Sequence, residues 1–463
     1  MATIQKQATG ARSDLKRVLR VRDGLAVTVG MVIAAGILRS PGLIAGYLGK
    51  PSLIMAVWVL GGIMAALATL MLAEMSAALP EAGGKYVYAR AAYGNGAGFV
   101  AGWGEIIVTR GFSGAAKAVV IAEYLTILLG RGSVPILAMG VVLAFAFVHL
   151  GGVRSSKRFQ NATTILKILV LLGIAAAGLM GRGHGGGSSG AGASPTATGL
   201  LGFALAYQMV AFAYYGYEDV AKMAEEFENP GRSMPRILLG GALAVAALYL
   251  LMNLAYFGAL SVQQMAGAPL VAQDAIAGVF GSTAGKVVVA AAILILLSSL
   301  NVNFFGMPRV AFALARDRLG PKLFQRVSER GTPVPGLLLA SAIILVLAMS
   351  GTFETLIRFM MLVALSVDLM VLTGFFRLHN RAGLEKPFRM PGYPWLPALT
   401  IVLYAAVIVI IVATEPRLAM GAAAMVAALI IGAVFTSRRV RRLEAQVAEA
   451  TTDASPGGPR SAG

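Results

Sequence analysis

Apolar runs long enough to cross a lipid bilayer recur along almost the whole chain. A helix needs roughly 20 apolar residues to cross a hydrocarbon core of about 30 Å. We predict about twelve such spans, at residues 24–48, 52–78, 94–128, 132–151, 159–181, 199–224, 236–260, 280–314, 335–351, 355–376, 396–413 and 418–436. Because the bilayer core offers no water to the peptide groups, each span is expected to be helical. The sequence therefore predicts an all-α polytopic membrane protein.

Composition agrees with this class. Hydrophobic residues make up 57% of the chain and charged residues only 13%, whereas a soluble domain carries about 25% charged residues. The net charge of +18 could suggest a nucleic-acid partner, so its distribution matters more than its sum. The basic residues gather before the first span and in every second loop, as in Arg154, Lys157 and Arg158. This alternation follows the positive-inside rule and favours a membrane over nucleic acid.

The same charge pattern predicts the topology. An even number of spans with basic residues on one side places both termini in the cytoplasm, and the first span acts as its own targeting signal. We expect a multi-pass protein of the plasma membrane, whose surroundings are the lipid bilayer. The oligomeric state is not predicted.

Several partners and chemistries are excluded by residue counts. The chain has no cysteine, which rules out disulfides and a disulfide-linked partner subunit. Its three histidines, His149, His184 and His379, are far apart and form no metal-ligand cluster. We therefore expect no metal, no cofactor and no enzymatic activity.

Two spans are interrupted at matching places. Residues 32–42, VIAAGILRSPG, break span one, and residues 212–219, FAYYGYED, break span six. Interruptions five spans apart are typical of a transporter built from two inverted five-helix repeats, with its substrate near the bilayer midplane. Small residues in membrane helices can also serve helix packing alone. We favour the transporter interpretation because two breaks occupy corresponding positions.

This pattern divides the chain into predicted regions. They are a cytoplasmic tail (1–22), a first five-helix repeat (23–181), a Gly/Ser-rich extracellular loop (182–198), a second five-helix repeat (199–378), a cytoplasmic loop (379–395), helices 11 and 12 (396–436) and a disordered cytoplasmic tail (437–463).

A broken helix exposes peptide groups of both polarities. N–H groups at the start of one half-helix suit a carboxylate, and carbonyls at the end of the other suit an ammonium group or a cation. An α-amino acid carries both charges. Small residues let a ligand approach the backbone closely, and they stand at both breaks: Ala34, Ala35 and Gly36 at the first, Ala213 and Gly216 at the second.

Six segments in order resemble one family. They are VIAAGILRSPG (32–42), AEMSAALPEAGGKYVYARAAYG (73–94), GWGEIIVTRGFSGAAKAVVIAEYL (102–125), FAYYGYEDVAKMAEEFENPGRSMPR (212–236), GMPRVAFALARDRLGPKLF (306–324) and PFRMPGYPWLPAL (387–399). Together they resemble the amino acid, polyamine and organocation permeases, in particular the L-type amino acid transporters and their bacterial relatives. The resemblance covers almost the whole chain.

The resemblance implies a five-plus-five inverted repeat of the LeuT-like kind with broken helices 1 and 6, two added helices, and amino acid transport by alternating access. It also implies the substrate contacts. Backbone N–H groups of Ala34, Ala35, Gly36 and Ile37, following Ile33, would bind the substrate carboxylate. Carbonyls around Phe212, Ala213, Tyr214 and Gly216 would bind the amino group, and Phe212 would be an aromatic gate. The chain has Ala34 where the family usually has Gly, and this added methyl narrows the expected carboxylate site.

Lys167 is the ionisable residue that we expect to matter most. It lies about ten residues into span five, roughly 15 Å deep at 1.5 Å per residue, where charge is costly and commonly functional. The resemblance implies a lysine that stands in for a sodium ion. We therefore expect Lys167 to bind freed carbonyls near Val32 and Ile33 and the region of Ser298 and Ser299, without a requirement for sodium. A buried lysine with a fixed structural partner is the alternative.

Arg110 and Lys117 are seven residues apart in span three and so share a helix face. They could favour an acidic substrate side chain. We favour a scaffold role, in which they pair with Glu74, Glu105, Glu123 or Asp368.

The sequence thus predicts a sodium-independent secondary transporter of amino acids. We prefer small or branched neutral amino acids, because no unpaired charge is evident near the breaks. Exchange and proton symport stay open, as do acidic, cationic or related amine substrates. An intramembrane enzyme and a channel are poorer alternatives, because neither a nucleophile-base set nor a ring of repeated charges is present. A sensor that keeps this fold without transport stays open.

Overall fold

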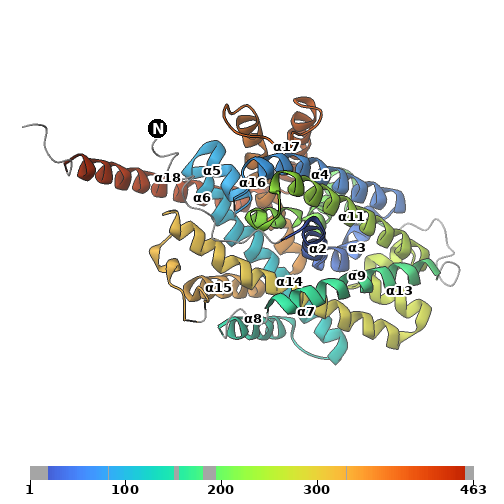
Figure 1. The fold of residues 1–463 in the computed structure, drawn as a ribbon. Helices are drawn as coiled ribbons and strands as arrows, with labels where there is room; N and C mark the ends of the chain where they lie inside the picture. The colour runs from blue at the N-terminus through green and yellow to red at the C-terminus, as the bar shows by residue number, and fades with distance from the viewer. Residues whose placement is uncertain (1–18, 82, 151–155, 181–193, 330, 454–463) are drawn as a thin grey trace, which may run out of the picture.

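The computed structural model describes residues 19–81, 83–150, 156–180, 194–329 and 331–453 (Figure 1). These residues form helices and one isolated β-bridge, between Leu19 and Phe227, with no longer strand in the described part. The elements are α2 (Val21–Val32), α3 (Ala35–Leu48), α4 (Pro51–Ala78), α5 (Lys85–Tyr93), α6 (Asn95–Gly104), η1 (Glu105–Phe112), α7 (Ser113–Leu129), α8 (Val134–Leu150), α9 (Ser156–Met180), α10 (Gly199–Tyr214), η2 (Tyr217–Glu226), α11 (Pro230–Ala259), α12 (Val262–Gly267), α13 (Val271–Phe280), α14 (Ser282–Arg316), η3 (Lys322–Gln325), α15 (Val334–Ser350), α16 (Phe353–His379), α17 (Trp395–Thr414) and α18 (Pro416–Asp453).

Most of the predicted spans correspond to helices that are long and apolar enough to cross a membrane. Within the described residues, 8 helical segments are long and apolar enough to cross a membrane, and the bent pair α2 and α3 makes a possible ninth. The helices α8 and α15, the part of α9 from residue 165 onward, and α13 are apolar but shorter. An all-helical membrane protein is thereby confirmed. The count of twelve stays a prediction that requires α8, α9 and α15 to cross as well.

The first interruption falls where the sequence places it. Helix α2 ends at Val32, α3 begins at Ala35, and the two segments are bent by 44°. Between them Ala34 adopts φ −152° and ψ −149°, which is not helical. The last carbonyls of α2 and the first N–H groups of α3 therefore have no partners within their own helices.

The second interruption lies at Tyr215 and Gly216. Helix α10 ends at Tyr214, Tyr215 is extended, and Gly216 has φ +114°. L side chains rarely adopt such an angle, which explains the glycine. The chain continues as η2, a tighter 3₁₀ helix. Both expected breaks are therefore present, although α10 and η2 are bent less sharply than α2 and α3.

The broken segments lie in the middle of the bundle (Figure 1). Helix α2 packs against α11, η2 and α9, and α3 packs against α10 and α12. Helix α14 packs against α7, and α16 contacts α7, α10 and η1. The later helix α17 packs on α10 and α16, and the C-terminal part of α18 projects away from the bundle. The two breaks are thus enclosed by α7, α14 and α16.

The structure differs from the predicted regions at the C-terminal end of the chain. A disordered tail was expected from residue 437, but α18 continues as a helix to Asp453; the Arg-, Glu- and Ala-rich sequence there consists of good helix formers. Residues 454–463 lie outside the described residues, as do 1–18 of the N-terminal tail and 182–193 of the Gly/Ser-rich loop. The short helices α5, α12 and α13 occupy segments that were not assigned as spans.

Candidate functional site

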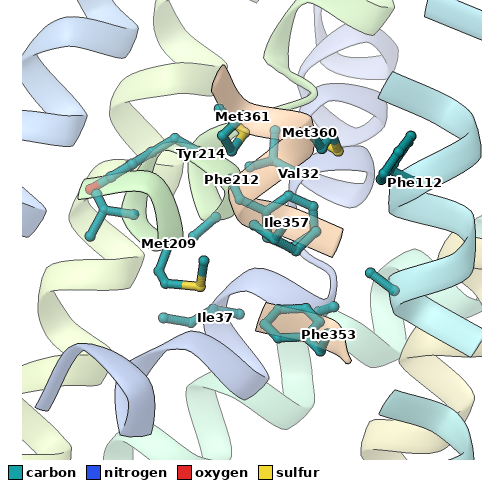
Figure 2. Packing of buried hydrophobic residues seen from close by; sticks show 14 of the residues in the cluster. Val32, Ile37, Phe112, Met209, Phe212, Tyr214, Phe353, Ile357, Met360 and Met361 are labelled. Atoms are coloured by element: carbon teal, nitrogen blue, oxygen red, sulfur yellow. The ribbon is translucent and has the colours of Figure 1, made fainter. Parts of the chain in front are cut away.

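A cavity of about 60 Å³ lies between the two breaks. Its walls come from the end of α2 and the start of α3, from the α10–η2 break, and from η1, α7, α14 and α16. On its apolar side, Val32 and Phe212 from the breaks lie near Met360 of α16 (Figure 2). The cavity thus borders residues of both breaks and a wall of hydrophobic side chains.

The predicted substrate-binding residues divide into two groups. Ala34, Gly36, Phe212 and Gly216 line the cavity. The other five are not among its lining residues, and all are buried beside it: Ile33, Ala35, Ile37, Ala213 and Tyr214. The hydroxyl of Tyr214 donates a hydrogen bond to the carbonyl of Trp58 at 3.1 Å, so this side chain points toward α4.

The two breaks touch each other. A methyl group added at Gly36 would lie 2.3 Å from Cα of Ala213. Contacts this close are not tolerated between carbon atoms, so only glycine fits at position 36 while the breaks remain in this arrangement. Helices α3 and α10 can therefore pack backbone to backbone.

One tyrosine joins the two breaks. The hydroxyl of Tyr249 on α11 lies 3.1 Å from the carbonyl oxygens of both Val32 and Ala213, to which it can donate. Its ring packs edge-on against Trp58, with 5.5 Å between centroids. Tyr249 therefore shares its single O–H donor between carbonyl groups of the two breaks.

Lys167 occupies the position expected near the first break. Its side chain is 0% exposed, and its ammonium donates to the carbonyl of Gly30 at 3.0 Å. The acceptor is therefore Gly30 instead of Val32 or Ile33. Gly30 lies two residues before the end of α2. Ser298 and Ser299 are buried on α14, and Ser299 lines the cavity. Lys167 has no carboxylate within 4.0 Å among the described residues.

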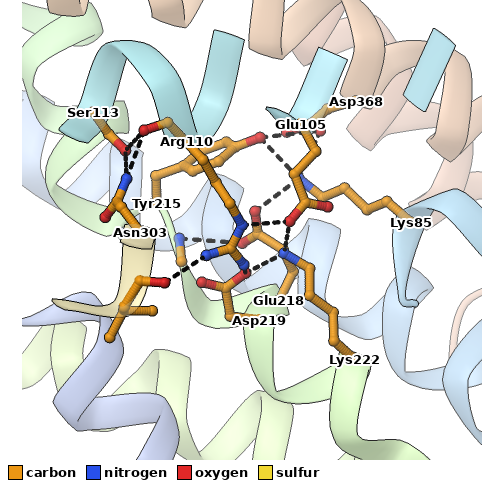
Figure 3. Close-up of polar contacts among 12 residues, drawn as sticks. Lys85, Glu105, Arg110, Ser113, Tyr215, Glu218, Asp219, Lys222, Asn303 and Asp368 are labelled. Atoms are coloured by element: carbon orange, nitrogen blue, oxygen red, sulfur yellow. Dashed lines mark hydrogen bonds and ion pairs between the residues drawn. The ribbon is translucent and has the colours of Figure 1, made fainter. Parts of the chain in front are cut away.

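Arg110 is held by ion pairs. Its guanidinium donates to Glu105 at 2.7 Å and to Asp219 at 3.1 Å, and a third hydrogen bond reaches the carbonyl of Val302. Lys222 is hydrogen-bonded to the same two carboxylates (Figure 3). The expected pairing with Glu105 is thus present. The π-helical segment η1, in which Arg110 lies, is an irregularity often found at functional sites.

Lys117 has a different environment. Its ammonium donates to Oδ1 of Asn303 at 2.8 Å, and the side chain is 9% exposed. The amide nitrogen of Asn303 donates in turn to the carbonyl of Arg110 and to the hydroxyl of Ser113 (Figure 3). In the part of the chain that the structure describes, no carboxylate lies within 4.0 Å of Lys117. The expected ion pair with Glu74, Glu105, Glu123 or Asp368 is therefore wrong for this lysine.

A second set of charges adjoins the cavity. Lys85 of α5 lies 2.8 Å from Glu218 of η2 and 2.6 Å from Asp368 of α16, and it also donates to the hydroxyl of Tyr215 (Figure 3). Burial by itself would lower the pKa of Lys85, but the two carboxylates outweigh that effect and hold the pKa well above its ordinary value. Lys85 therefore stays charged and connects three elements on this side of the cavity.

On the α3 side, Arg39 links two helices. Its guanidinium lies 3.1 Å from Glu123 of α7 and 6.0 Å from the ring centre of Phe353. Phe353 meets Phe212 edge-on, with 5.8 Å between centroids (Figure 2). Arg39 thus joins α3 to α7 beside the aromatic pair. Lys85 joins α5, η2 and α16.

Sequence reasoning missed several cavity residues. Those not singled out from the sequence are Met31, Thr109, Ser113, Tyr215, Val302, Asn303 and Met360. Asn303 offered a signal, since an amide within the apolar run of span eight needs a hydrogen-bond partner. The others are ordinary residues of membrane helices, and only packing reveals that they face the cavity.

Comparison with known proteins gives a consistent result. The sequence profile of a family described as amino acid permease matches residues 21–435. A serine/threonine exchanger of Bacillus subtilis is 28% identical over 397 residues, which cover 84% of this chain and 90% of that protein. A branched-chain amino acid permease of Lactococcus lactis is 26% identical, with 84% and 88% covered. The human Asc-type amino acid transporter 1 is 27% identical, with 88% and 79% covered.

Proposed function

Because the chain belongs to the amino acid permease family, we propose that it carries amino acids across a membrane by alternating access. The observation that supports this most directly is the cavity between the α2–α3 and α10–η2 breaks. It borders the N-terminal end of α3, which attracts anions, and the C-terminal ends of α2 and α10, which attract cations. A zwitterion complements both.

The substrate's main-chain groups would bind at the two breaks. Its carboxylate would accept hydrogen bonds from N–H groups in the segment from Ala34 to Ile37, and its amino group would donate to carbonyls between Phe212 and Gly216. Ala34 and Gly36 line the cavity, so the backbone there is accessible to a small ligand. Phe212 would close over the ligand, supported by its contact with Phe353.

We also propose that the chain has the inverted-repeat architecture. Residues 23–181 and 199–378 would be the two five-helix halves, with helices 11 and 12 in residues 396–436 outside them. Twelve crossings and the charge pattern would place both termini in the cytoplasm of a plasma-membrane protein. Loop labelling on either side of the membrane tests this topology.

We propose that transport does not require sodium. The ammonium of Lys167 donates to Gly30 at the carbonyl end of α2, where a cation is favoured by the helix dipole. A fixed protein cation there would take the place of a bound sodium ion. Replacement of external sodium by choline should leave the flux unchanged.

The preference for small or branched neutral amino acids now has one supporting and one opposing observation. The cavity is small, about 60 Å³, which favours small substrates. The absence of an unpaired charge no longer supports neutrality, because Lys117 lines the cavity without a carboxylate partner among the described residues. The uptake screen should therefore include acidic and cationic amino acids as well as neutral ones.

Uptake into liposomes tests the proposed function. The purified chain is reconstituted, and uptake of a panel of radiolabelled amino acids is measured with and without amino acid inside. Accumulation above that of protein-free liposomes supports transport. A lack of flux for every amino acid, with either gradient imposed, would contradict it.

The same liposomes separate exchange from proton symport. Exchange requires internal amino acid and is insensitive to an imposed pH gradient. Symport proceeds without internal substrate and accelerates when the outside is acidified. The buried Lys167 is the group whose protonation such a symport would involve, since the described residues give it no carboxylate partner.

A further inference from the structure

Four charged residues line the cavity, and three of them are paired. Arg110 contacts Glu105 and Asp219, Asp219 contacts Lys222, and Glu218 contacts Lys85. Lys117 is the exception, with no carboxylate within 4.0 Å in the described part of the chain. Among the described residues, the cavity wall therefore carries one amino group, that of Lys117, without a neighbouring carboxylate.

The contact with Asn303 does not complete the coordination of Lys117. An ammonium group has three N–H donors, and Asn303 accepts one hydrogen bond at 2.8 Å. The Asn303 amide nitrogen donates to the carbonyl of Arg110 at 2.6 Å and to Ser113 at 2.9 Å, which fixes the amide orientation. Asn303 thus holds the Lys117 ammonium in place and, among the residues that the structure describes, leaves two donors for another acceptor.

The surroundings make that acceptor energetically important. Lys117 is only 9% exposed, and a buried cation without a counter-charge is costly. Its side chain borders the cavity that also borders both breaks. Glu218 and Asp219 line the same cavity, but they are paired with Lys85, Arg110 and Lys222. A ligand in the cavity could therefore supply an anionic partner for Lys117.

We propose that Lys117 binds the side-chain carboxylate of an acidic amino acid in the substrate cavity. This inference rests on the proposed function, since it assigns a substrate class to the same site. The two N–H donors left by Asn303 would bond to the carboxylate oxygens. A cationic side chain would be repelled, and a neutral one would leave the ammonium without a counter-charge.

The side-chain carboxylate is a better partner than the α-carboxylate. Main-chain N–H groups at the start of α3 already form an anion site for the α-carboxylate. Lys117 reaches the cavity from α7, so it belongs to a separate wall. L-Aspartate is the smaller of the two common dicarboxylic amino acids and is therefore the first ligand to test in a cavity of about 60 Å³.

Isothermal titration of the purified full-length chain tests the assignment with three ligands of similar size. L-Aspartate carries the anion, L-asparagine is its neutral near-isostere, and L-2,4-diaminobutyrate carries a cation. The variants are Lys117→Met, whose side chain is of similar length and uncharged, and Lys117→Arg, which keeps a positive charge. Lys286→Met removes an exposed lysine of α14 and is the matched control.

The expected result is a preference that depends on Lys117. The unmodified chain and Lys286→Met should bind L-aspartate about tenfold more tightly than L-asparagine, as one charge-assisted hydrogen bond implies. Lys117→Met should bring the ratio to about one, with L-asparagine affinity little changed. Lys117→Arg should keep part of the preference.

Three outcomes would overturn the assignment. L-Aspartate could bind no better than L-asparagine to the unmodified chain, the ratio could persist in Lys117→Met, or that variant could weaken both ligands equally, which would place the α-carboxylate at Lys117. The first needs no variant, so a misfolded Lys117→Met would not prevent a decision. If no amino acid binds or moves at all, the proposed function itself fails; if neutral amino acids move and aspartate gains nothing, only this assignment fails.

Discussion

The ammonium of Lys167 on α9 lies 3.0 Å from the carbonyl oxygen of Gly30 in the last turn of α2, although 137 residues separate them. The carbonyl end of a helix carries partial negative charge, so a cation there is stabilised. Since α2 ends at the break, this hydrogen bond ties the Lys167 side chain to the backbone next to the cavity.

Lys167→Ala should reduce amino acid flux by about tenfold or more, because the carbonyl of Gly30 loses its charged donor. The variant should still elute as a folded protein on size exclusion. The measurement is uptake into liposomes, with Lys286→Ala as the control for loss of a lysine. Flux equal to that of the unmodified chain would remove the proposed role of Lys167.

Tyr249→Phe should destabilise the chain by about 1–3 kcal/mol, because carbonyls at both breaks lose a buried donor. Tyr256→Phe is a matched control on the same helix, since the Tyr256 hydroxyl is buried with no hydrogen-bond partner among the described residues. Thermal unfolding of both variants checks this. Equal melting temperatures would show that the Tyr249 hydroxyl contributes nothing.

Gly36→Ala should destabilise the chain by about 1–3 kcal/mol, because its methyl would lie 2.3 Å from the backbone of Ala213 and must push the breaks apart. Gly46→Ala, on the same helix, is the control, since its nearest neighbouring atom would be 3.8 Å away. Thermal stability and aspartate binding should both fall in the first variant only. If Gly36→Ala matched Gly46→Ala, the close packing of the breaks would be disproved.

Arg39 and Glu123 should show coupling in a double-mutant cycle. Their contact is 3.1 Å long and partly exposed, so we expect about 0.5–1 kcal/mol. Arg39→Ala and Glu123→Ala are compared with the double variant by thermal unfolding. Additive effects would mean that the pair does not hold α3 to α7.

The sequence determined the class of structure and the places where helices stop. Long apolar runs have one stable solution in lipid, so helices followed from the pattern without knowledge of their neighbours. Gly216 adopts φ +114° at the predicted second break, an angle that glycine tolerates for local steric reasons. The pairing of Arg110 with Glu105 is likewise local, since both lie in one helical segment.

Only the tertiary structure decided which buried charges found partners. Lys117 reaches Asn303 across 186 residues, and Lys85 reaches Asp368 across 283. Spans three and eight are apolar on most of their surface, so no polar stripe reveals which face turns inward. Lys117 contacts Asn303 instead of a carboxylate because of how α7 and α14 pack. Membrane helices pack by shape and hydrogen bonding, because lipid is as apolar as the helix surfaces and provides no hydrophobic driving force. For that reason the unpaired ammonium in the cavity could be found only in three dimensions.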